Sequence, residues 1–235
     1  MTLLTTEIHL DGDAAFVIFA ADRRISRGGR AIEDATKILR VRGSPVGVGF
    51  FGLAELASPR ESKPMSVLLT ELADAMPPGS SPAAFAELLL QKLRAEMPYN
   101  DVINEPIGFH VCGFASDGEP EFWYVRNIDD QGFPTRKGFE SREDFRARDR
   151  GRLLPGQYAI YRNGDLQAHI AAWAAIDESL GKLLGSPTFR ALKTPEDHEL
   201  WVKTKMELIG SFYQRFATEQ IIGNPIDSFS ISRAA

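Results

Sequence analysis

Two apolar, β-capable runs open the chain, and a short polar segment separates them. Leu3 to Leu10 and Ala14 to Ala21 flank Asp11-Gly12-Asp13, so the pattern predicts a β-hairpin. The second run is apolar at successive positions, which indicates a strand covered on both faces. Asp22 follows this run directly, so we expect an acidic side chain at the end of a buried strand.

The length of the turn sets which residues of the hairpin face one another. With the turn centred on Gly12, Asp22 lies opposite Thr2. The same register places three apolar side chains on one shared face: Leu4, Ile8 and Leu10. We therefore expect Thr2 and Asp22 to meet at one end of the first two strands.

The rest of the chain predicts strands and helices in separate blocks. Strands are expected at Thr36 to Val41, Ser44 to Phe51, Ile107 to Ala115 and Glu121 to Val125, with a last one within Ile221 to Ile231. Helices are expected at Met65 to Met76, Ser81 to Met97, Ala168 to Leu184 and Glu196 to Gln220. Asn163-Gly164 carries the signal of another hairpin turn. In the last helix a core-facing set is expected: Trp201, Met206, Ile209, Phe212 and Phe216.

This order of elements predicts an α+β fold with two antiparallel sheets between helical layers. The helix pair within Met65–Met97 and the pair within Ala168–Gln220 are expected on opposite outer faces. A chain of 235 residues with 43% hydrophobic positions is long enough for one sizeable core. We therefore expect a single domain over residues 1–235.

One segment, at about residues 127–155, differs in composition from the rest. Arginines and lysines alternate there with glutamates and aspartates, which is typical of a solvated insert or exposed helix because the signs largely cancel. Three aromatic residues interrupt it: Phe133, Phe139 and Phe145. We expect a neighbouring subunit to cover them.

Charge and cysteine content exclude several classes of protein. A net charge of −5 argues against a general nucleic-acid binder, and no apolar run approaches the ~20 residues of a membrane span. The single cysteine, Cys112, lies in a strand-like run and is expected to be a buried structural thiol. With no secretory leader pattern and no internal disulfide, we expect a cytoplasmic protein.

Motifs for metals, nucleotides and serine hydrolases are absent from the sequence. The four histidines form no His-Glu-x-x-His pattern, and there is neither a Gly-x-x-x-x-Gly-Lys-Ser/Thr loop nor a Gly-x-Ser-x-Gly motif. We therefore expect no cofactor.

The chemistry that the first residues suggest is nucleophilic. A threonine at a free N-terminus carries its own base, because an α-amine with a pKa of about 7.7–8.0 accepts the hydroxyl proton near neutral pH. Lys37, at the start of the third strand, would lower the pKa of that hydroxyl and be held charged by Asp22. Because Lys37 begins a strand outside the apolar run, we also expect its replacement to leave the protein folded.

In this region the chain resembles the proteasome-type branch of the N-terminal-nucleophile (Ntn) hydrolases, which includes proteasome β-subunits and related bacterial proteins. The resemblance rests on three strings: Ala20-Ala21-Asp22-Arg23-Arg24-Ile25-Ser26, Lys37-Ile38-Leu39 and Val48-Gly49-Phe50-Phe51-Gly52-Leu53-Ala54. It implies a four-layer αββα sandwich, and a threonine-type peptidase or amidase that acts through an acyl-enzyme ester. Thr2 would be the nucleophile, Asp22 and Lys37 its charge partners, Ser26 a substrate-backbone contact, and the Gly49 N–H an oxyanion donor.

The chain also departs from the pattern of that family. There the nucleophile and the acid are about sixteen positions apart, which selects Thr6, but pairing Thr6 with Asp22 would dissolve the Asp11-Gly12-Asp13 turn, so Thr2 is preferred over Thr5 and Thr6. Met1 must be removed before Thr2 has a free amine. Glu219 and Ile222 stand where relatives carry a supporting aspartate and serine, so Glu219, together with Arg24, is expected to support the site.

Two classes of function remain open from the sequence. One is an N-terminal-threonine hydrolase that cleaves peptide or amide bonds, and the other is a catalytically silent, proteasome-like scaffold or assembly subunit. The resemblance to proteasome-type proteins also implies self-association. We therefore expect a homo-oligomer, either a ring or a stacked ring.

Overall fold

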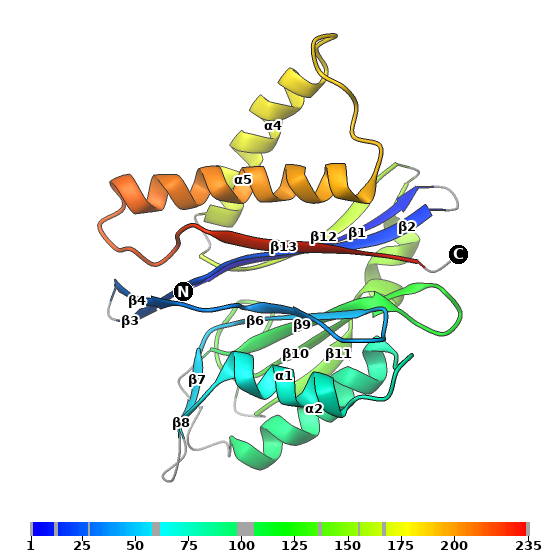
Figure 1. The fold of residues 1–235 in the computed structure, drawn as a ribbon, viewed down its shortest axis with the longest axis vertical. Coiled ribbons are helices and arrows are strands. Elements are labelled where there is room, and N and C mark those ends of the chain that lie inside the picture. The colour runs from blue at the N-terminus through cyan, green and yellow to red at the C-terminus, as the bar shows by residue number, and fades with distance from the viewer. Residues whose placement is uncertain are drawn as a thin grey trace.

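A computed structural model describes residues 2–11, 14–27, 29–57, 62–97, 106–135, 138–154, 156–165 and 168–233. Two antiparallel sheets lie face to face at its centre, with helices on the outer side of each (Figure 1). The fold is therefore of the α+β class. None of the helices in these ranges is both long and apolar enough to cross a membrane.

The first sheet joins distant parts of the chain. Its strand order is β12-β1-β2-β13, with bounds Tyr158–Gly164, Leu3–Asp11, Ala14–Asp22 and Ile226–Ser232. The two strands of the predicted hairpin, β1 and β2, are its centre, and the last strand pairs with β2. Both faces of β1 and β2 are covered, as the apolar sequence of the second run predicts.

The second sheet is built from the middle of the chain. Its order is β11-β10-β9-β6-β5, with bounds Glu140–Glu143, Pro120–Arg126, Gly108–Phe114, Val46–Phe51 and Ile38–Arg40. Two short hairpins lie beside the sheets: β3 (Arg24–Arg27) with β4 (Arg30–Asp34), and β7 (Glu55–Ala57) with β8 (Ser62–Pro64).

The helices form two separate pairs, as predicted. Helices α1 (Met65–Ala75) and α2 (Pro82–Glu96) lie on the outer side of the second sheet, where α2 packs on β9 and β10. On the far side of the first sheet, a π-helical turn (Ala168–Ala172) leads into α4 (Trp173–Leu184), and α5 (Pro195–Phe216) packs on β2 and β13. In Figure 1 the C-terminal end of α4 projects away from the rest of the molecule.

Polar caps begin two of these helices. Ser81 accepts a hydrogen bond from the Ala84 N–H at the start of α2, and Thr194 with Asp197 forms a reciprocal capping box at the start of α5. Each cap satisfies backbone N–H groups that the first helical turn leaves without partners.

Three apolar clusters hold the layers together. One lies between α1, α2 and the second sheet, and another lies between the two sheets. The third lies between the first sheet and α4 and α5. Cys112 is fully buried in the cluster between the sheets, which confirms the expectation of a buried thiol.

The predicted hairpin is present, but its register is shifted by one residue. Leu4 pairs with Ala21 and Asp11 with Ala14, so Asp22 falls opposite Leu3 and not opposite Thr2. The reason is that two residues, and not three, separate the last paired positions of the strands. Gly12 itself lies outside the described residues. The expected face is confirmed: Leu4 and Ile8 are in the cluster between the sheets, and Leu10 packs against it.

The charged segment at about 127–155 is not an insert separate from the fold. Residues 140–143 form β11, which extends the second sheet beside β10, and short helical turns follow at Phe145–Asp149 and Arg150–Arg152. Phe139 and Phe145 are buried inside the protein, whereas Phe133 is exposed. The core clusters of the same chain therefore cover two of the three aromatics that we expected a neighbouring subunit to cover.

Two further expectations are wrong. Asn163-Gly164 is not a hairpin turn, because both residues belong to β12 and pair with Leu4 and Leu3 of β1. In α5, Met206 and Ile209 are buried, but Phe212 and Phe216 are exposed. The two phenylalanines therefore belong to the surface and not to the core.

Candidate functional site

Asp22 is at the end of β2 and is completely buried. Its Oδ1 accepts a hydrogen bond of 2.7 Å from the Leu3 N–H, and its Oδ2 accepts one of 3.2 Å from the Arg24 N–H. The first bond ties the carboxylate to the beginning of β1. Asp22 is therefore bonded to the residue that follows Thr2, although the strand register does not place Asp22 and Thr2 opposite each other.

Lys37, which immediately precedes β5, is the partner of Asp22. Its Nζ lies 2.9 Å from Asp22 Oδ1 and 2.6 Å from the carbonyl oxygen of Arg24. Its side chain is 1% exposed, and its own carbonyl oxygen accepts a hydrogen bond from the Phe50 N–H of β6. The position is thus fixed from both sides, by the second sheet through the backbone and by the first sheet through the ammonium group.

Burial sets the protonation behaviour of this pair. Loss of solvation lowers the pKa of the Lys37 amine and raises the pKa of the Asp22 carboxyl, while the attraction between the two groups opposes both shifts. A lysine whose pKa is lowered in this way exchanges a proton more readily than a lysine in water. Perturbed groups of this kind concentrate at functional sites, although structural ion pairs also perturb pKa values.

Thr2 is held by the end of β12. Its carbonyl oxygen accepts a hydrogen bond of 3.1 Å from the Asp165 N–H, and the preceding residue, Gly164, pairs with Leu3. A Cβ atom on Gly164 would lie 1.5 Å from the Thr2 carbonyl oxygen, so only glycine permits this approach. Three parts of the chain therefore meet around Thr2 and Leu3: the start of β1, the end of β2 with Lys37, and the end of β12.

The other two candidate nucleophiles lie inside β1. Thr5 pairs with Ala20 and Arg162, and Thr6 with Phe19 and Tyr161, so each is enclosed by strands on both sides. Both are completely buried.

The Thr6 hydroxyl contacts His110 instead of the Asp22–Lys37 pair. It lies 3.0 Å from Nδ1 of that histidine, whose Nε2 lies 2.7 Å from Asn163 Oδ1. Burial lowers the pKa of His110 to about 3, so this histidine is neutral at pH 7. Thr6 is therefore engaged away from the Asp22–Lys37 pair, and the preference for Thr2 over Thr5 and Thr6 stays a prediction.

Gly49 is placed for packing. It lies in β6, between Ile38 and His110 of the neighbouring strands, and a Cβ atom there would lie 2.8 Å from Leu4 Cδ1 of β1. Because the Phe50 N–H points toward Lys37 and successive N–H groups of a strand alternate in direction, the Gly49 N–H points toward β9. The oxyanion role expected of Gly49 stays a prediction that this geometry does not favour.

The remaining predicted site residues divide into two groups. Arg24 supports the site through its backbone, since its N–H binds Asp22 and its carbonyl binds Lys37. Ser26 is two residues further along β3, pairs with Ala31 and is half-buried. Glu219 is exposed and lies against Gly29, where a Cβ atom would be 3.0 Å from its Cγ. The structure does not show Glu219 joining the Asp22–Lys37 pair.

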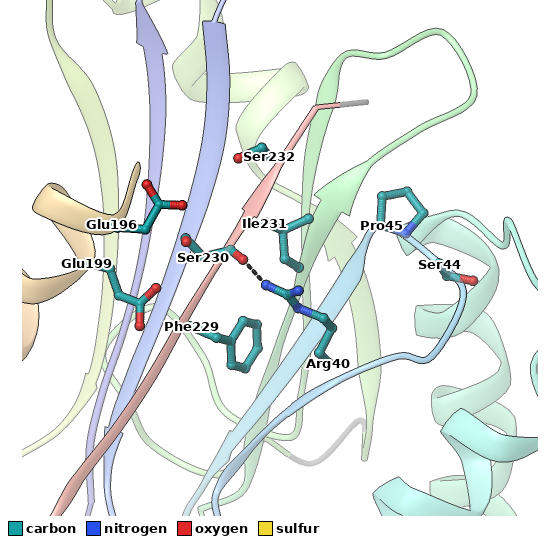
Figure 2. Close-up of a pocket in the computed structure, with 9 residues that line it drawn as sticks. All are labelled: Arg40, Ser44, Pro45, Glu196, Glu199, Phe229, Ser230, Ile231 and Ser232. Atoms are coloured by element: carbon teal, nitrogen blue, oxygen red, sulfur yellow. Dashed lines mark hydrogen bonds between the residues drawn. The ribbon is translucent and has the colours of Figure 1, made fainter. Parts of the chain in front are cut away.

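A surface hollow lies elsewhere on the molecule (Figure 2). Arg40 donates a hydrogen bond to the Ser230 carbonyl there and lies over the ring of Phe229 at 5.4 Å, while Glu196 and Glu199 line the side toward α5. Ser230 pairs with Ile18, four residues before Asp22, so the hollow is about 14 Å along β2 from the Asp22–Lys37 pair. It is therefore not part of the candidate site.

Asp165 and Gly164 belong to the site but were not among the residues expected there. Asp165 is buried, and its Oδ1 accepts hydrogen bonds from the Ala168 N–H at 2.9 Å and from the Tyr213 hydroxyl at 2.6 Å. An aspartate three residues before the first helical residues is a capping signal, and it was available in the sequence. The pairing of β12 with β1 was not, because it joins residues about 160 positions apart.

The site consists of a buried lysine–carboxylate pair beside the first residues of the chain, with a backbone clamp from β12 on Thr2. Within the described ranges no cluster of three or more histidine, cysteine, aspartate or glutamate side chains is placed to hold a metal ion. A scan against protein-family models finds no match to this chain, and a search of curated proteins finds none either.

Proposed function

We propose that the protein is an N-terminal-threonine hydrolase that cleaves peptide or amide bonds. The observation that supports this most is the buried Lys37–Asp22 pair, whose carboxylate is hydrogen-bonded to the Leu3 N–H, one residue from Thr2. Burying two charges is expensive, and a well-packed apolar pair is often as stable. A charge-dependent role at the start of β1 gives a reason for keeping the pair.

The proposed nucleophile is Thr2 in the chain from which Met1 has been removed, because only then does Thr2 carry a free α-amine. In the chain with Met1, Thr2 is 3% exposed. The Thr2 hydroxyl oxygen attacks the substrate carbonyl while its proton passes to the α-amine. The C–N bond then breaks, the leaving amine takes that proton, and an ester remains. Attack by water on the ester releases the acid and restores the hydroxyl.

Lys37 is assigned to the stabilisation of charge on the Thr2 oxygen. An ammonium group has three N–H donors, and the described contacts with Asp22 and Arg24 use two of them. We assign the third donor to the Thr2 oxygen. Removing one donor from a developing oxyanion typically lowers the rate about 10²–10³-fold.

The arrangement of helices and sheets supports the same proposal. Two antiparallel sheets with a helix pair outside each are what a four-layer αββα Ntn-hydrolase fold requires. The order of Asp22, Arg24 and Lys37 along the chain, and their contact in space, agree with the resemblance to the proteasome-type branch. A cytoplasmic location is part of this proposal.

Covalent labelling tests the nucleophile directly. We expect a β-lactone probe to acylate the processed chain once, on the peptide that contains Thr2, because the ester formed there is the catalytic intermediate. Thr2→Ala should abolish labelling and peptide hydrolysis, whereas Thr2→Ser should retain both. Mass spectrometry of the intact protein and of its peptides measures the adduct and reports whether Met1 is present.

The control for this experiment is Thr6→Ala, which removes the other hydroxyl that the spacing of the family would select. Full labelling in Thr6→Ala supports Thr2. Loss of labelling in Thr6→Ala with full labelling in Thr2→Ala would reject it. If the wild-type chain that starts at Thr2 neither labels nor cleaves any peptide, the scaffold function replaces the hydrolase.

We also propose that the protein assembles with copies of itself through α5. The exposed apolar side chains of this helix form a stripe at multiples of four residues, here called the α5 stripe: Leu200, Leu208, Phe212 and Phe216. Side chains four positions apart lie about 40° apart around a helix, so Leu208, Phe212 and Phe216 share one face at the end of α5, where the rings of Phe212 and Phe216 are in contact. Two copies related by a two-fold axis present the same face to each other, and we therefore propose a second copy of the chain as the partner.

The prediction is that Phe212→Ser with Phe216→Ser weakens self-association by at least about tenfold, because fully burying a phenylalanine contributes about 1.5–3 kcal/mol. Sedimentation velocity over micromolar concentrations measures the assembly. Phe133→Ser is the matched control, since Phe133 is as exposed as Phe212 but lies in the charged segment. A wild-type protein that is monomeric throughout, or an assembly lost only in Phe133→Ser, would contradict the assignment to α5.

A further inference from the structure

The hydrogen bonds around Asp165 connect Thr2 to helix α5. The Asp165 N–H donates to the Thr2 carbonyl at 3.1 Å, and the Asp165 carboxylate accepts from the Tyr213 hydroxyl at 2.6 Å. The same oxygen, Oδ1, accepts from the Ala168 N–H at 2.9 Å. One residue therefore links the first strand, the π-helical turn and the last helix.

We infer that Asp165 and Tyr213 are positioning residues for the Thr2 nucleophile. Tyr213 and the Ala168 N–H hold the Asp165 carboxylate, which fixes the backbone of Asp165, and that backbone holds Thr2. This inference rests on the proposed function of Thr2. It assigns to the end of β12 and to α5 the supporting role that we expected of Glu219.

The geometry of the strand pair supports this direction of action. Asp165 continues the β12–β1 register, in which Leu3 pairs with Gly164, so it lies opposite Thr2. The Asp165 carbonyl oxygen in turn accepts a hydrogen bond of 3.2 Å from the His169 N–H of the π-helical turn. Both backbone polar groups of Asp165 are therefore held, one by Thr2 and one by the turn that precedes α4.

The carboxylate is suited to this task because it is buried and oriented by two donors. Asp165 is 9% exposed, and a hydrogen bond to an ionised acceptor is stronger than a neutral one. Replacing Tyr213 by Phe removes one of the two donors and nothing else. The Asp165 backbone then gains freedom, and so does Thr2.

Tyr213→Phe and Tyr161→Phe form a matched pair of variants for the test. Tyr161 donates to Asp149 Oδ2 at 2.7 Å, so each variant loses one phenol–carboxylate hydrogen bond, but only Tyr213 is connected to Thr2. In the processed chain we expect Tyr213→Phe to lower the maximal acylation rate by the β-lactone about tenfold, the effect of one hydrogen bond to a charged group. The concentration for half-maximal rate should stay unchanged. Tyr161→Phe should leave both values unchanged.

A second readout does not depend on activity. Hydrogen exchange of the Asp165 and Leu3 amides, followed by NMR, should be faster in Tyr213→Phe than in Tyr161→Phe, because these amides bind Thr2 and Asp22. Asp165→Asn keeps the N–H and an acceptor oxygen, so it should retain more activity than Asp165→Ala.

The possible outcomes separate the two proposals. If wild type is not acylated but Tyr213→Phe still speeds exchange at Leu3 and Asp165, the hydrolase proposal fails and the positioning contact stands. If wild type is acylated and the two tyrosine variants behave alike in rate and in exchange, the positioning role is wrong and the hydrolase proposal stands.

Discussion

Lys37→Met should destabilise the protein by about 3–5 kcal/mol and lower acylation of Thr2 about 10²–10³-fold. The stability loss follows from burial: the variant leaves the Asp22 carboxylate inside the protein without its cation, and an uncompensated buried charge costs this much. The loss of rate follows from the proposed donor to the Thr2 oxygen. Urea unfolding and β-lactone acylation measure the two effects. The position of Lys37 at a strand start led us to expect little change in stability, and its burial reverses that expectation.

A double variant separates structure from chemistry. Asp22→Leu with Lys37→Met replaces the ion pair by two apolar side chains, and such replacements are often neutral or stabilising. We expect the double variant to recover at least half of the stability lost by Lys37→Met but none of the acylation. If acylation returned with stability, Lys37 would have a structural role only, and the proposed function would lose its main support.

The local parts of the fold could be predicted from the sequence because they depend on neighbouring residues. The hairpin of β1 and β2, the capped helices α2 and α5 and the buried Cys112 all follow from periodicity, turn residues or capping residues within short windows. The contact between Asp22 and Lys37 was expected from the family resemblance, and the structure places their charged atoms 2.9 Å apart.

Long-range pairing could not be predicted in the same way. Asn163-Gly164 has the local signal of a turn, yet β1 supplies a partner strand about 160 residues away, and that pairing overrides the signal. The charged segment at about residues 127–155 differs from the expected solvated insert for a related reason. Arg142 binds Asp130 and Asp144, and Arg146 binds Asp117, so its charges are paired within the fold and Phe145 can be buried beneath them.

The first hairpin shows that an error of one residue in the strand register changes which residues meet at the site. A shift by one residue moves Asp22 from Thr2 to Leu3, and the turn composition alone does not distinguish a two-residue from a three-residue connection. Asp22 still contacts the start of β1 after this correction, because its carboxylate accepts a hydrogen bond from the Leu3 N–H.

Gly164→Ala should disable the site from the other side. The added Cβ would lie 1.5 Å from the Thr2 carbonyl oxygen, and the residue has φ of 121°, where side chains are strained. We expect a loss of about 3–4 kcal/mol, of which roughly 1–2 kcal/mol comes from the backbone conformation. Because misplacing a reacting group by ~1 Å costs about 10²-fold, acylation of Thr2 should fall by at least this factor.

Gly132→Ala is the control that separates the effect of backbone strain from the effect of a steric clash. Gly132 also has a positive φ, 88°, but a Cβ there meets nothing within 4 Å. This variant therefore loses only the free energy that the strained backbone conformation costs. We therefore expect Gly132→Ala to lose roughly 1–2 kcal/mol in urea unfolding and to acylate at the wild-type rate. Equal stability losses in the two variants, or normal acylation in Gly164→Ala, would mean that β12 does not hold Thr2. A larger loss in Gly164→Ala together with failed acylation ties the position of the nucleophile to the end of β12.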